Sequence, residues 1–378
     1  MTPEQAQEKI NRLGEKYSEI STQDDAEKRA KPKKPAGKKK KNTAAKIILG
    51  IIIFILCLAL VASVALFIMV ESGKKNLLNN DADIETPEQA ESQDDGKTVR
   101  YNGKIYKLDE NITSIACLGV DKEEINQNGI VGSSGQADTI MIIAFDTVSG
   151  SASVIPIPRD TVAEIDVYAS DGSFLRNEKT QICLSYAYGD GGKTSCENTV
   201  SAVRKLMFGL PINSYAALDL SGIAVLNDTV GGVTVTPQES FRNFRKGETV
   251  TLKGDEAMNF VRYRDTSKVD SNLNRMNRQI QYVSAFTSTA VGKVKSNLSS
   301  ITDIYNTAMD YAYTSINLSD ATYLATRFIS GSGRGTFETY SVPGKMVEGD
   351  DGYSEYYIDE TAFYELILSV YYDVIGTY

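Results

Sequence analysis

The chain has 378 residues, 42% of them hydrophobic, which is enough for one large or two modest domains beside any terminal segments. Its formal net charge is -9, and this acidic balance argues against a nucleic-acid partner, because phosphate backbones are met by broad basic surfaces. The chain contains no histidine, which excludes Ser-His and Cys-His nucleophile systems and histidine-ligated zinc.

Residues 1–46 are polar, and their second half is strongly basic. Lys28 to Lys46 holds ten basic residues and no acidic one, and it is broken by Pro32 and Pro35. Such a segment cannot bury enough apolar surface to fold, so we expect a disordered tail.

An uncharged run follows at residues 47–70 and is long enough to cross about 30 Å of hydrocarbon as one transmembrane helix. A cleaved signal peptide is the competing interpretation, but the run is too long and lies too far from the start. The basic residues precede the run, which predicts a cytoplasmic N-terminus and an extracellular C-terminal part in a single-pass membrane protein.

Residues 71–97 are acidic and contain Pro87, which predicts a flexible stalk. From residue 98 the pattern changes to that of a folded extracellular domain, residues 98–376. It opens with alternating sequence around Asn102-Gly103, which predicts a β-hairpin.

Strands and helices then alternate, which predicts one mixed α/β domain. Apolar, β-branched runs predict strands, and a Gly-rich segment at 125–136 predicts a loop between two of them. A capping-box pattern at Thr194 to Glu197 predicts the start of an amphipathic helix, and Asp359 is expected to cap another near the end. The predicted strands are 112–120, 139–145, 152–157, 233–236 and 336–342, and further helices are predicted at 219–230, 254–263 and 274–295.

Cys183 and Cys196 bracket a Gly-rich loop in the exported part of the chain. An extracellular location permits a disulfide between them but does not demand it, so their pairing stays open.

The stretch from Val261 to Gln279 concentrates arginines: Arg262, Arg264, Arg275 and Arg278 fall within 17 positions. Guanidinium groups match the paired oxygens of phosphates and carboxylates, so the cluster indicates an anion site. A solvated basic face is the simpler alternative, but an arginine cluster within an acidic domain favours a focused pocket.

Three polar motifs lie at the ends of predicted strands. Asp121 follows one strand, Asp138 begins the next, and Arg159 leaves the third. Polar groups at strand ends are where open α/β folds assemble their sites. Two carboxylates together with a substrate phosphate suit Mg²⁺, although each aspartate alone has a structural interpretation as a turn residue.

The order of these motifs resembles the LytR-CpsA-Psr (LCP) family of Gram-positive envelope proteins. The resemblance rests on GVD, ADTIM, IPRDT, YAYG, VGGV, VRYRD and NRMNRQ, in that order. It implies an α/β domain with a central mixed sheet flanked by helices and a hydrophobic groove for a polyprenyl tail. It also implies a phosphotransferase that moves a glycopolymer, such as teichoic acid or capsule, from polyprenyl pyrophosphate to peptidoglycan, usually to the C6 hydroxyl of muramic acid.

The resemblance also implies roles for individual residues. Asp121 and Asp138 would hold Mg²⁺, and either would be a candidate base for the acceptor hydroxyl. Gln279 would add a hydrogen bond to the pyrophosphate. The guanidinium groups expected to grip the phosphate oxygens are those of Arg159, Arg262, Arg264 and Arg275.

Four positions depart from the family pattern. Gln136 stands where arginine is usual, Asn272 replaces an aspartate, Asn274 a glycine and Cys183 an asparagine. Gln136 and Asn272 motivate one alternative, a polyprenyl-phosphate-binding or regulatory envelope protein without catalysis. A second alternative is a pyrophosphatase, which differs from the transferase only in using water as the acceptor.

Overall fold

The computed structural model describes residues 7–8, 10–15, 43–78, 84–120, 129–265, 271–331, 336–350 and 352–378. Side chains are not described at 43–51, 220 and 271–273. The chain divides into two units, Met1–Val64 and Ala65–Tyr378. The disorder expected for the basic tail falls largely outside the described residues.

Helix α2 (Thr43–Leu77) is longer than the 24-residue apolar run. Within it, the described stretch Ile52–Leu77 is long and apolar enough to cross a membrane, by length and composition. The last turns of α2 belong to the second unit, where the side chain of Leu77 is fully buried. Asn76 Nδ2 donates to Asp320 Oδ1 at 3.1 Å, and the hydroxyl of Thr113 donates to the carbonyl of Leu77 at 2.8 Å.

These contacts correct the prediction of a flexible stalk at 71–97. Its first seven residues are helical, Ile84 is buried in the main core, and β1 (Glu91–Gln93) pairs with β2 (Thr98–Tyr101). The segment is acidic, but its few apolar side chains are buried by the domain, so the domain begins before residue 98.

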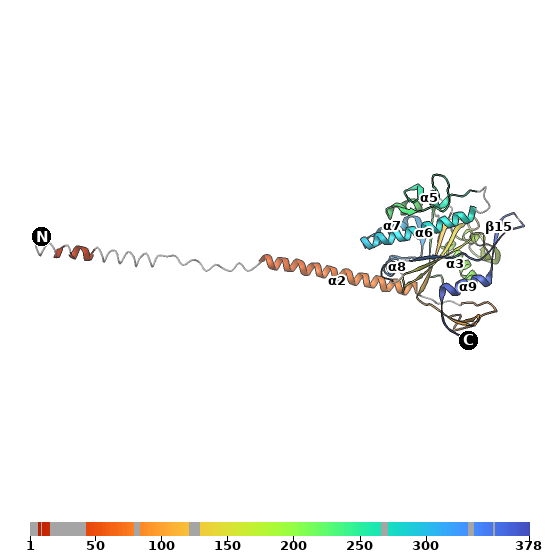
Figure 1. Cartoon of the computed structure of the whole chain (residues 1–378), viewed down its shortest axis with the longest axis horizontal. Helices are drawn as coiled ribbons and strands as arrows, with labels where there is room; N and C mark the ends of the chain where they lie inside the picture. Colours follow the sequence, from red (N-terminus) through yellow and green to blue (C-terminus); the bar gives the residue numbers. More distant parts are fainter. Residues whose placement is uncertain are drawn as a thin grey trace. The chain divides into compact units, whose positions relative to one another are not determined.

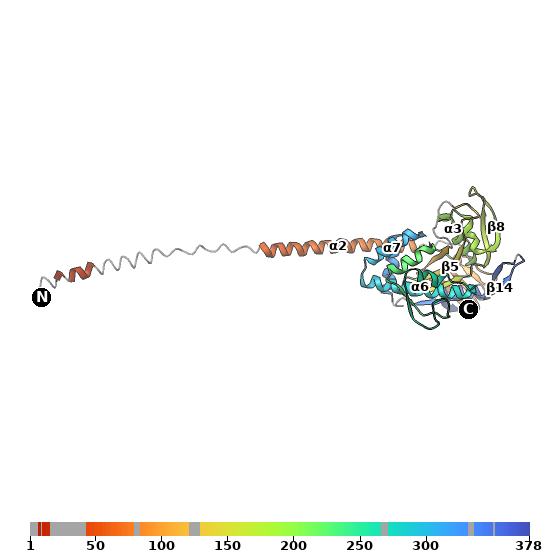
Figure 2. The ribbon, with the colours of Figure 1, turned by 90° about the horizontal axis from the view of Figure 1, so that it is seen from above.

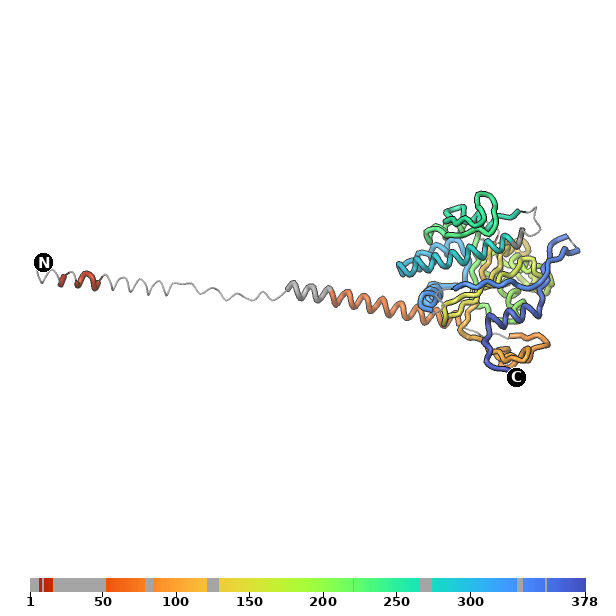
Figure 3. The backbone as a smooth tube through the Cα atoms, viewed as in Figure 1, coloured from red at the N-terminus to blue at the C-terminus, as the bar shows by residue number. Residues whose placement is uncertain are grey.

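The predicted hairpin is confirmed. It joins β2 to β3 (Lys104–Leu108), and both turn residues lie in the left-handed region, with φ of 48° at Asn102 and 75° at Gly103. This geometry matches the right-handed twist of the two strands. The last strand, β16 (Tyr372–Thr377), pairs antiparallel with β3, so the two ends of the domain lie side by side (Figure 3).

Among the described residues, the central sheet has six strands in the order β12-β9-β4-β5-β6-β13. The middle strands β4, β5 and β6 are antiparallel neighbours, whereas β4–β9 and β6–β13 are parallel pairs, so the predicted mixed α/β class is confirmed. The strands are β4 (Ile112–Val120), β5 (Ala137–Asp146), β6 (Ala152–Ile157), β9 (Ser214–Leu218), β12 (Ala312–Thr314) and β13 (Phe337–Thr339).

Helices cover both faces of this sheet (Figures 1 and 2). On one face, α3 (Lys193–Leu206) and α9 (Glu360–Tyr371) pack into the main core through residues such as Val203 and Phe363. On the other lie α6 (Ser271–Ser296) and α8 (Leu318–Ser330), where Phe328 of α8 stacks on Phe145 of β5 with ring centroids 6.0 Å apart.

A second apolar cluster carries the elements that lead to the arginine stretch. It joins β10 (Val233–Val235), β11 (Val250–Leu252) and α5 (Asp255–Arg262) to α6. The helices α4 (Leu220–Thr229) and α7 (Ser300–Tyr311) pack on each other beside it. Ala257, Phe260 and Val261 are buried in this cluster, as their spacing predicts.

One local prediction needs correction, and several elements were missed. The capping box at Thr194 is wrong: α3 begins at Lys193, and Asp190 Oδ1 accepts from the backbone N–H groups of Gly192 and Thr194. The sequence also did not predict the hairpin of β7 (Val162–Tyr168) and β8 (Phe174–Gln181), the 3-10 helix η1 (Ile182–Tyr188), or the hairpin of β14 (Gly344–Glu348) and β15 (Ser354–Ile358). β8 is mostly polar and exposed, so it lacks the alternation that marks a strand.

Candidate functional site

The predicted strand-end residues fall at one edge of the central sheet. β4 ends at Val120, which pairs with Ala137 at the start of β5, and Ile157 at the end of β6 pairs with Ile140 of β5. Asp138 and Arg159 are therefore brought to the same edge. Asp121, which follows β4 in the chain, lies outside the described residues.

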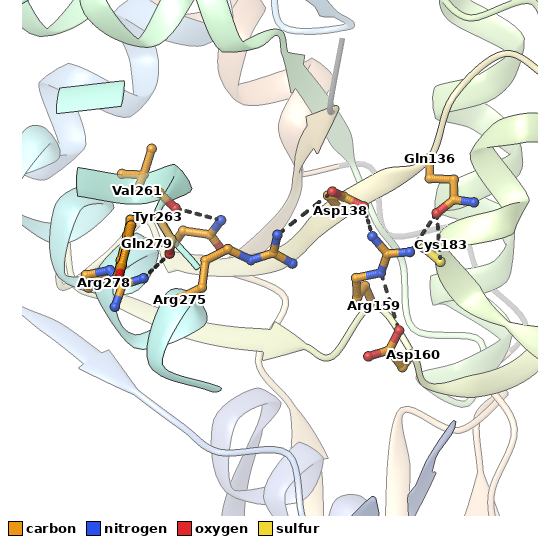
Figure 4. A network of polar contacts seen from close by, with 10 residues as sticks. All are labelled: Gln136, Asp138, Arg159, Asp160, Cys183, Val261, Tyr263, Arg275, Arg278 and Gln279. Atoms are coloured by element: carbon orange, nitrogen blue, oxygen red, sulfur yellow. Dashed lines mark hydrogen bonds and ion pairs between the residues drawn. The ribbon is translucent and has the colours of Figure 1, made fainter. Parts of the chain in front are cut away.

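The carboxylate of Asp138 lies between two guanidinium groups (Figure 4). Its Oδ1 accepts from Nη1 of Arg159, and its Oδ2 lies 3.9 Å from Nη1 of Arg275, which is on α6. Nε of Arg159 also pairs with Asp160 Oδ1 at 3.3 Å. The start of β5, the end of β6 and helix α6 thus contribute to one charged network.

This network is partly shielded from solvent and has more positive than negative groups. Burial lowers the pKa of Arg275, and the neighbouring Arg264 and Arg159 lower it further, while Asp138 opposes them. Three arginines thus act on two carboxylates, Asp138 and Asp160. Like charges held this close favour an anion with several oxygens, which would neutralise them together.

Asp160 is a site residue to which the sequence analysis assigned no role. Burial raises the pKa of its carboxyl group, while Arg159, Arg264 and Arg275 act in the opposite direction. Burial lowers the pKa of Arg159, but Cys183, Asp138 and Asp160 outweigh it, so the net shift is upward. The one sequence signal that could have identified Asp160 is its position directly after Arg159, where the chain leaves a strand.

The remaining predicted residues lie where α5 meets α6. Arg262 is the last residue of α5, and Arg264 follows two positions later. Gln279 Nε2 donates to the backbone carbonyl of Val261 at 3.3 Å, so it ties α6 to the end of α5. Of the predicted site residues, Asp138, Arg159 and Arg275 meet in direct ion pairs, and Arg264 joins them through its charge.

The guanidinium of Arg278 does not join that of Arg275 at Asp138 (Figure 4). The Arg278 side chain is only 4% exposed, and its guanidinium lies 4.5 Å from the ring centroid of Phe241. It pairs with Glu239 and donates to the carbonyls of Phe260 and Tyr263, so it fixes the chain just before Arg264. Of the four clustered arginines, Arg278 therefore has a structural role, and the expectation that it helps to form the anion site is wrong.

Cys183 and Cys196 are free, buried thiols, so the disulfide that the sequence left open is not formed. Burial raises the pKa of Cys183 to about 11 and that of Cys196 to about 12. Both therefore stay protonated at neutral pH.

The part of the chain that the structure describes contains no group of three or more acidic or cysteine side chains suited to a metal ion. Mg²⁺ seldom uses an all-protein cage and binds through one or two carboxylates plus substrate phosphates. Asp138 at the edge of an anion site fits such a ligand set, although its oxygens already face Arg159 and Arg275.

A mixed α/β domain with half-buried arginines gathered beside its strand ends defines a class of domain that can bind an anion with several oxygens. The model of the LytR_cpsA_psr family matches residues 73–367, and the chain belongs to this family.

The most similar curated relatives include two proteins named polyisoprenyl-teichoic acid--peptidoglycan teichoic acid transferase TagU. The one from Bacillus cereus is 28% identical over 259 residues, which cover 67% of this chain and 76% of that protein. The one from Bacillus mycoides is 26% identical over 276 residues, or 70% of this chain and 84% of that protein.

Solved structures share the fold. The crystal structure of B. subtilis TagV gives a TM-score of 0.56 at 22% identity, over 70% of this chain and 97% of that one. The structure described as TagT bound to LI-WTA gives 0.51 at 21% identity, over 69% and 89%. At this level of identity the likeness concerns the fold alone.

Proposed function

We propose that the protein is a membrane-anchored phosphotransferase that moves an anionic glycopolymer from a polyprenyl-pyrophosphate carrier to peptidoglycan. The observation that carries the proposal is the convergence of Arg159, Arg264 and Arg275 on Asp138 and Asp160 at one sheet edge. The names of the TagU relatives support the same reaction class.

In the proposed reaction, an acceptor hydroxyl of peptidoglycan attacks the phosphorus next to the sugar. The bond from that phosphorus to the bridging oxygen breaks, and polyprenyl phosphate leaves with the bond's electron pair. The arginines hold the non-bridging oxygens and stabilise their charge, which is most of what phosphoryl transfer needs from a protein. The hydroxyl proton passes to an aspartate, for which Asp138 is the described candidate.

Magnesium is the cofactor we propose, held by Asp138 and by Asp121, which lies outside the described residues. Bound there, the ion would neutralise phosphate charge beside the arginines. Removing divalent metal with EDTA should lower transfer, and added Mg²⁺ should restore it. Full transfer by the metal-free protein would refute this part of the proposal.

We place the transfer domain outside the cell, anchored by α2 with the N-terminus in the cytoplasm. The basic residues before α2 and its apolar composition support this orientation. A membrane-impermeant protease added to intact cells should remove the domain, whereas a domain that stays protected would contradict the orientation.

The test of the proposed function is the double variant Arg262→Ala with Arg264→Ala in a transfer assay. Loss of one preorganised donor typically costs about 10²–10³-fold in rate, so we expect a loss of at least that size. Arg242→Ala is the matched control, because Arg242 is exposed and bonds Asn259 instead. Unchanged transfer by the correctly folded double variant would refute the assignment.

A binder without catalysis is the second candidate, because Gln136 stands at the site where the family resemblance implies an arginine. Release of polyprenyl phosphate from a pyrophosphate-linked glycan separates the two candidates. An enzyme produces it at every turnover, whereas a binder produces none.

A further inference from the structure

Gln136 contacts the candidate site through one oxygen. Its Oε1 accepts from Nη2 of Arg159 at 2.6 Å, and the thiol of Cys183 lies 4.0 Å from the same oxygen (Figure 4). The backbone N–H of Cys183 also donates to the carbonyl of Arg159 at 3.2 Å. Gln136, Cys183 and Arg159 therefore form one connected unit built from three different segments.

All three side-chain nitrogens of Arg159 have partners. Nη1 contacts Asp138 and Nε contacts Asp160, which are acidic, whereas Nη2 contacts the neutral amide of Gln136. A carboxylate fixes a guanidinium but also cancels its charge. A neutral acceptor fixes the geometry without placing a third negative charge against the guanidinium, which keeps it more attractive to a phosphate.

Cys183 lies beside the end of the Gln136 amide that faces Arg159. A guanidinium offers only donors and a thiol is a weak donor, so both favour the oxygen of the amide over its NH₂ group. The thiol of Cys183 is fully buried and stays protonated at neutral pH. A buried, protonated thiol therefore lies beside Oε1, where it can donate to the oxygen but not accept from it.

We propose that Gln136, oriented by Cys183, is a positioning residue that holds the guanidinium of Arg159 in place for a phosphate group without neutralising it. The proposal rests on the proposed function, since it concerns how that site presents one of its cations. It gives the departures at positions 136 and 183 a shared role: the two residues act as a pair.

The first test compares Gln136→Glu with Gln136→Met in the full-length protein in detergent. Affinity for inorganic pyrophosphate is measured by calorimetry, and kcat/KM is measured in the glycopolymer transfer assay. A hydrogen bond to a charged group is worth roughly one to two powers of ten, so Gln136→Met should lower pyrophosphate affinity about tenfold or more. Gln136→Glu has nearly the same shape but cancels charge, so it should bind pyrophosphate more weakly still.

The second test asks whether Cys183 acts through Gln136. Cys183→Ala should lower pyrophosphate affinity in the wild-type background and have no further effect in Gln136→Met, because the orientation of the amide no longer matters there. Cys183→Ser keeps a donor and should retain affinity. A role in packing alone instead predicts equal losses of thermal stability in both backgrounds, with unchanged affinity.

The outcomes separate two failures. Wild-type protein that neither binds pyrophosphate nor performs transfer overturns the proposed function, and the positioning role with it. Active wild-type protein whose Gln136→Glu variant binds and turns over normally overturns the positioning role alone. So does a loss from Cys183→Ala that persists unchanged in Gln136→Met.

Discussion

Asp160 is held as a buried carboxyl group among arginines, and this gives it an unusual effect on stability. Burial raises its pKa in the folded protein. A carboxyl with a raised folded pKa binds its proton more tightly when folded, so its contribution is greatest at low pH. Stability is then lost as the pH rises from the ordinary aspartate pKa through the folded value.

Asp160→Asn removes this ionisation and should change the pH dependence of unfolding. We expect the melting temperature of the variant relative to wild type to increase as the pH rises from about 4 to 7. Thermal scans of both proteins across this range test the sign. A difference that stays constant with pH, or that shrinks as the pH rises, would contradict the assignment.

Some site residues could be predicted from the sequence and others could not. Asp138, Arg159 and Arg275 were predictable, because strand ends share an edge and arginines select anions. The role of Arg278 was not predictable. This residue lies three residues after Arg275, about 60° around the helix, and this offset allows one side chain to face the site and the other to face the core. The role of Gln136 depends on a side-chain contact that no sequence pattern encodes.

At the scale of elements, Arg278 joins α6 to the end of α5. It contacts Glu239, Phe241 and the carbonyls of Phe260 and Tyr263 while being almost fully buried. These contacts determine where the chain leaves α5, and so where Arg264 lies. Removing the guanidinium takes this partner away from the carboxylate of Glu239 and from the two backbone carbonyls.

We therefore expect Arg278→Ala to lower the free energy of unfolding by about 3–5 kcal/mol, as for breaking a buried charge pair, and to reduce transfer as well. Arg242→Ala is a matched control, because Arg242 lies 5.3 Å from the ring centroid of the same Tyr263 but is exposed. Its change should stay within about 0.5 kcal/mol. Equal losses in urea unfolding would show that the buried contacts do not matter.

The contact between the end of α2 and α8 is a second element-scale feature. A methyl group at Gly73 would overlap the backbone carbonyl of Ser319 and lie 2.8 Å from Cβ of Tyr323, whereas one at Gly292 on α6 would meet nothing within 4 Å. Both glycines are helical, so alanine should add about 1 kcal/mol of helix propensity at each.

Gly73→Ala should nevertheless lower the melting temperature, because α2 must move away from α8. Gly292→Ala should leave it unchanged or raise it. The two variants are compared by thermal unfolding of the full-length protein in detergent. If Gly73→Ala is as stable as Gly292→Ala, the packing of α2 on the domain is not tight.

The elements that the sequence predicted carry strong local signals. The Asn-Gly hairpin, the apolar strands β4 to β6 and the helix capped by Asp359 were all confirmed. The polar strand β8 and the start of the domain were missed. Both segments have a polar composition, which is typical of solvent-exposed loops. Their structure depends instead on strand pairing or on burial against segments far away in the sequence.

At the scale of the whole molecule, we propose that one site binds a diphosphate and transfers a phosphoryl-linked polymer to a hydroxyl. The fold places the contributors far apart in sequence, on β5, after β6 and on α6, and joins them at one sheet edge. A binder, a pyrophosphatase and a transferase would all use such a site, so the fate of the phosphorus distinguishes them.

The most direct measurement is phosphorus NMR of the products formed from a polyprenyl-pyrophosphate-linked saccharide and peptidoglycan by the full-length protein. We expect polyprenyl monophosphate together with a new phosphodiester between saccharide and peptidoglycan. Free saccharide phosphate in place of the phosphodiester, or an intact substrate after prolonged incubation, would contradict it.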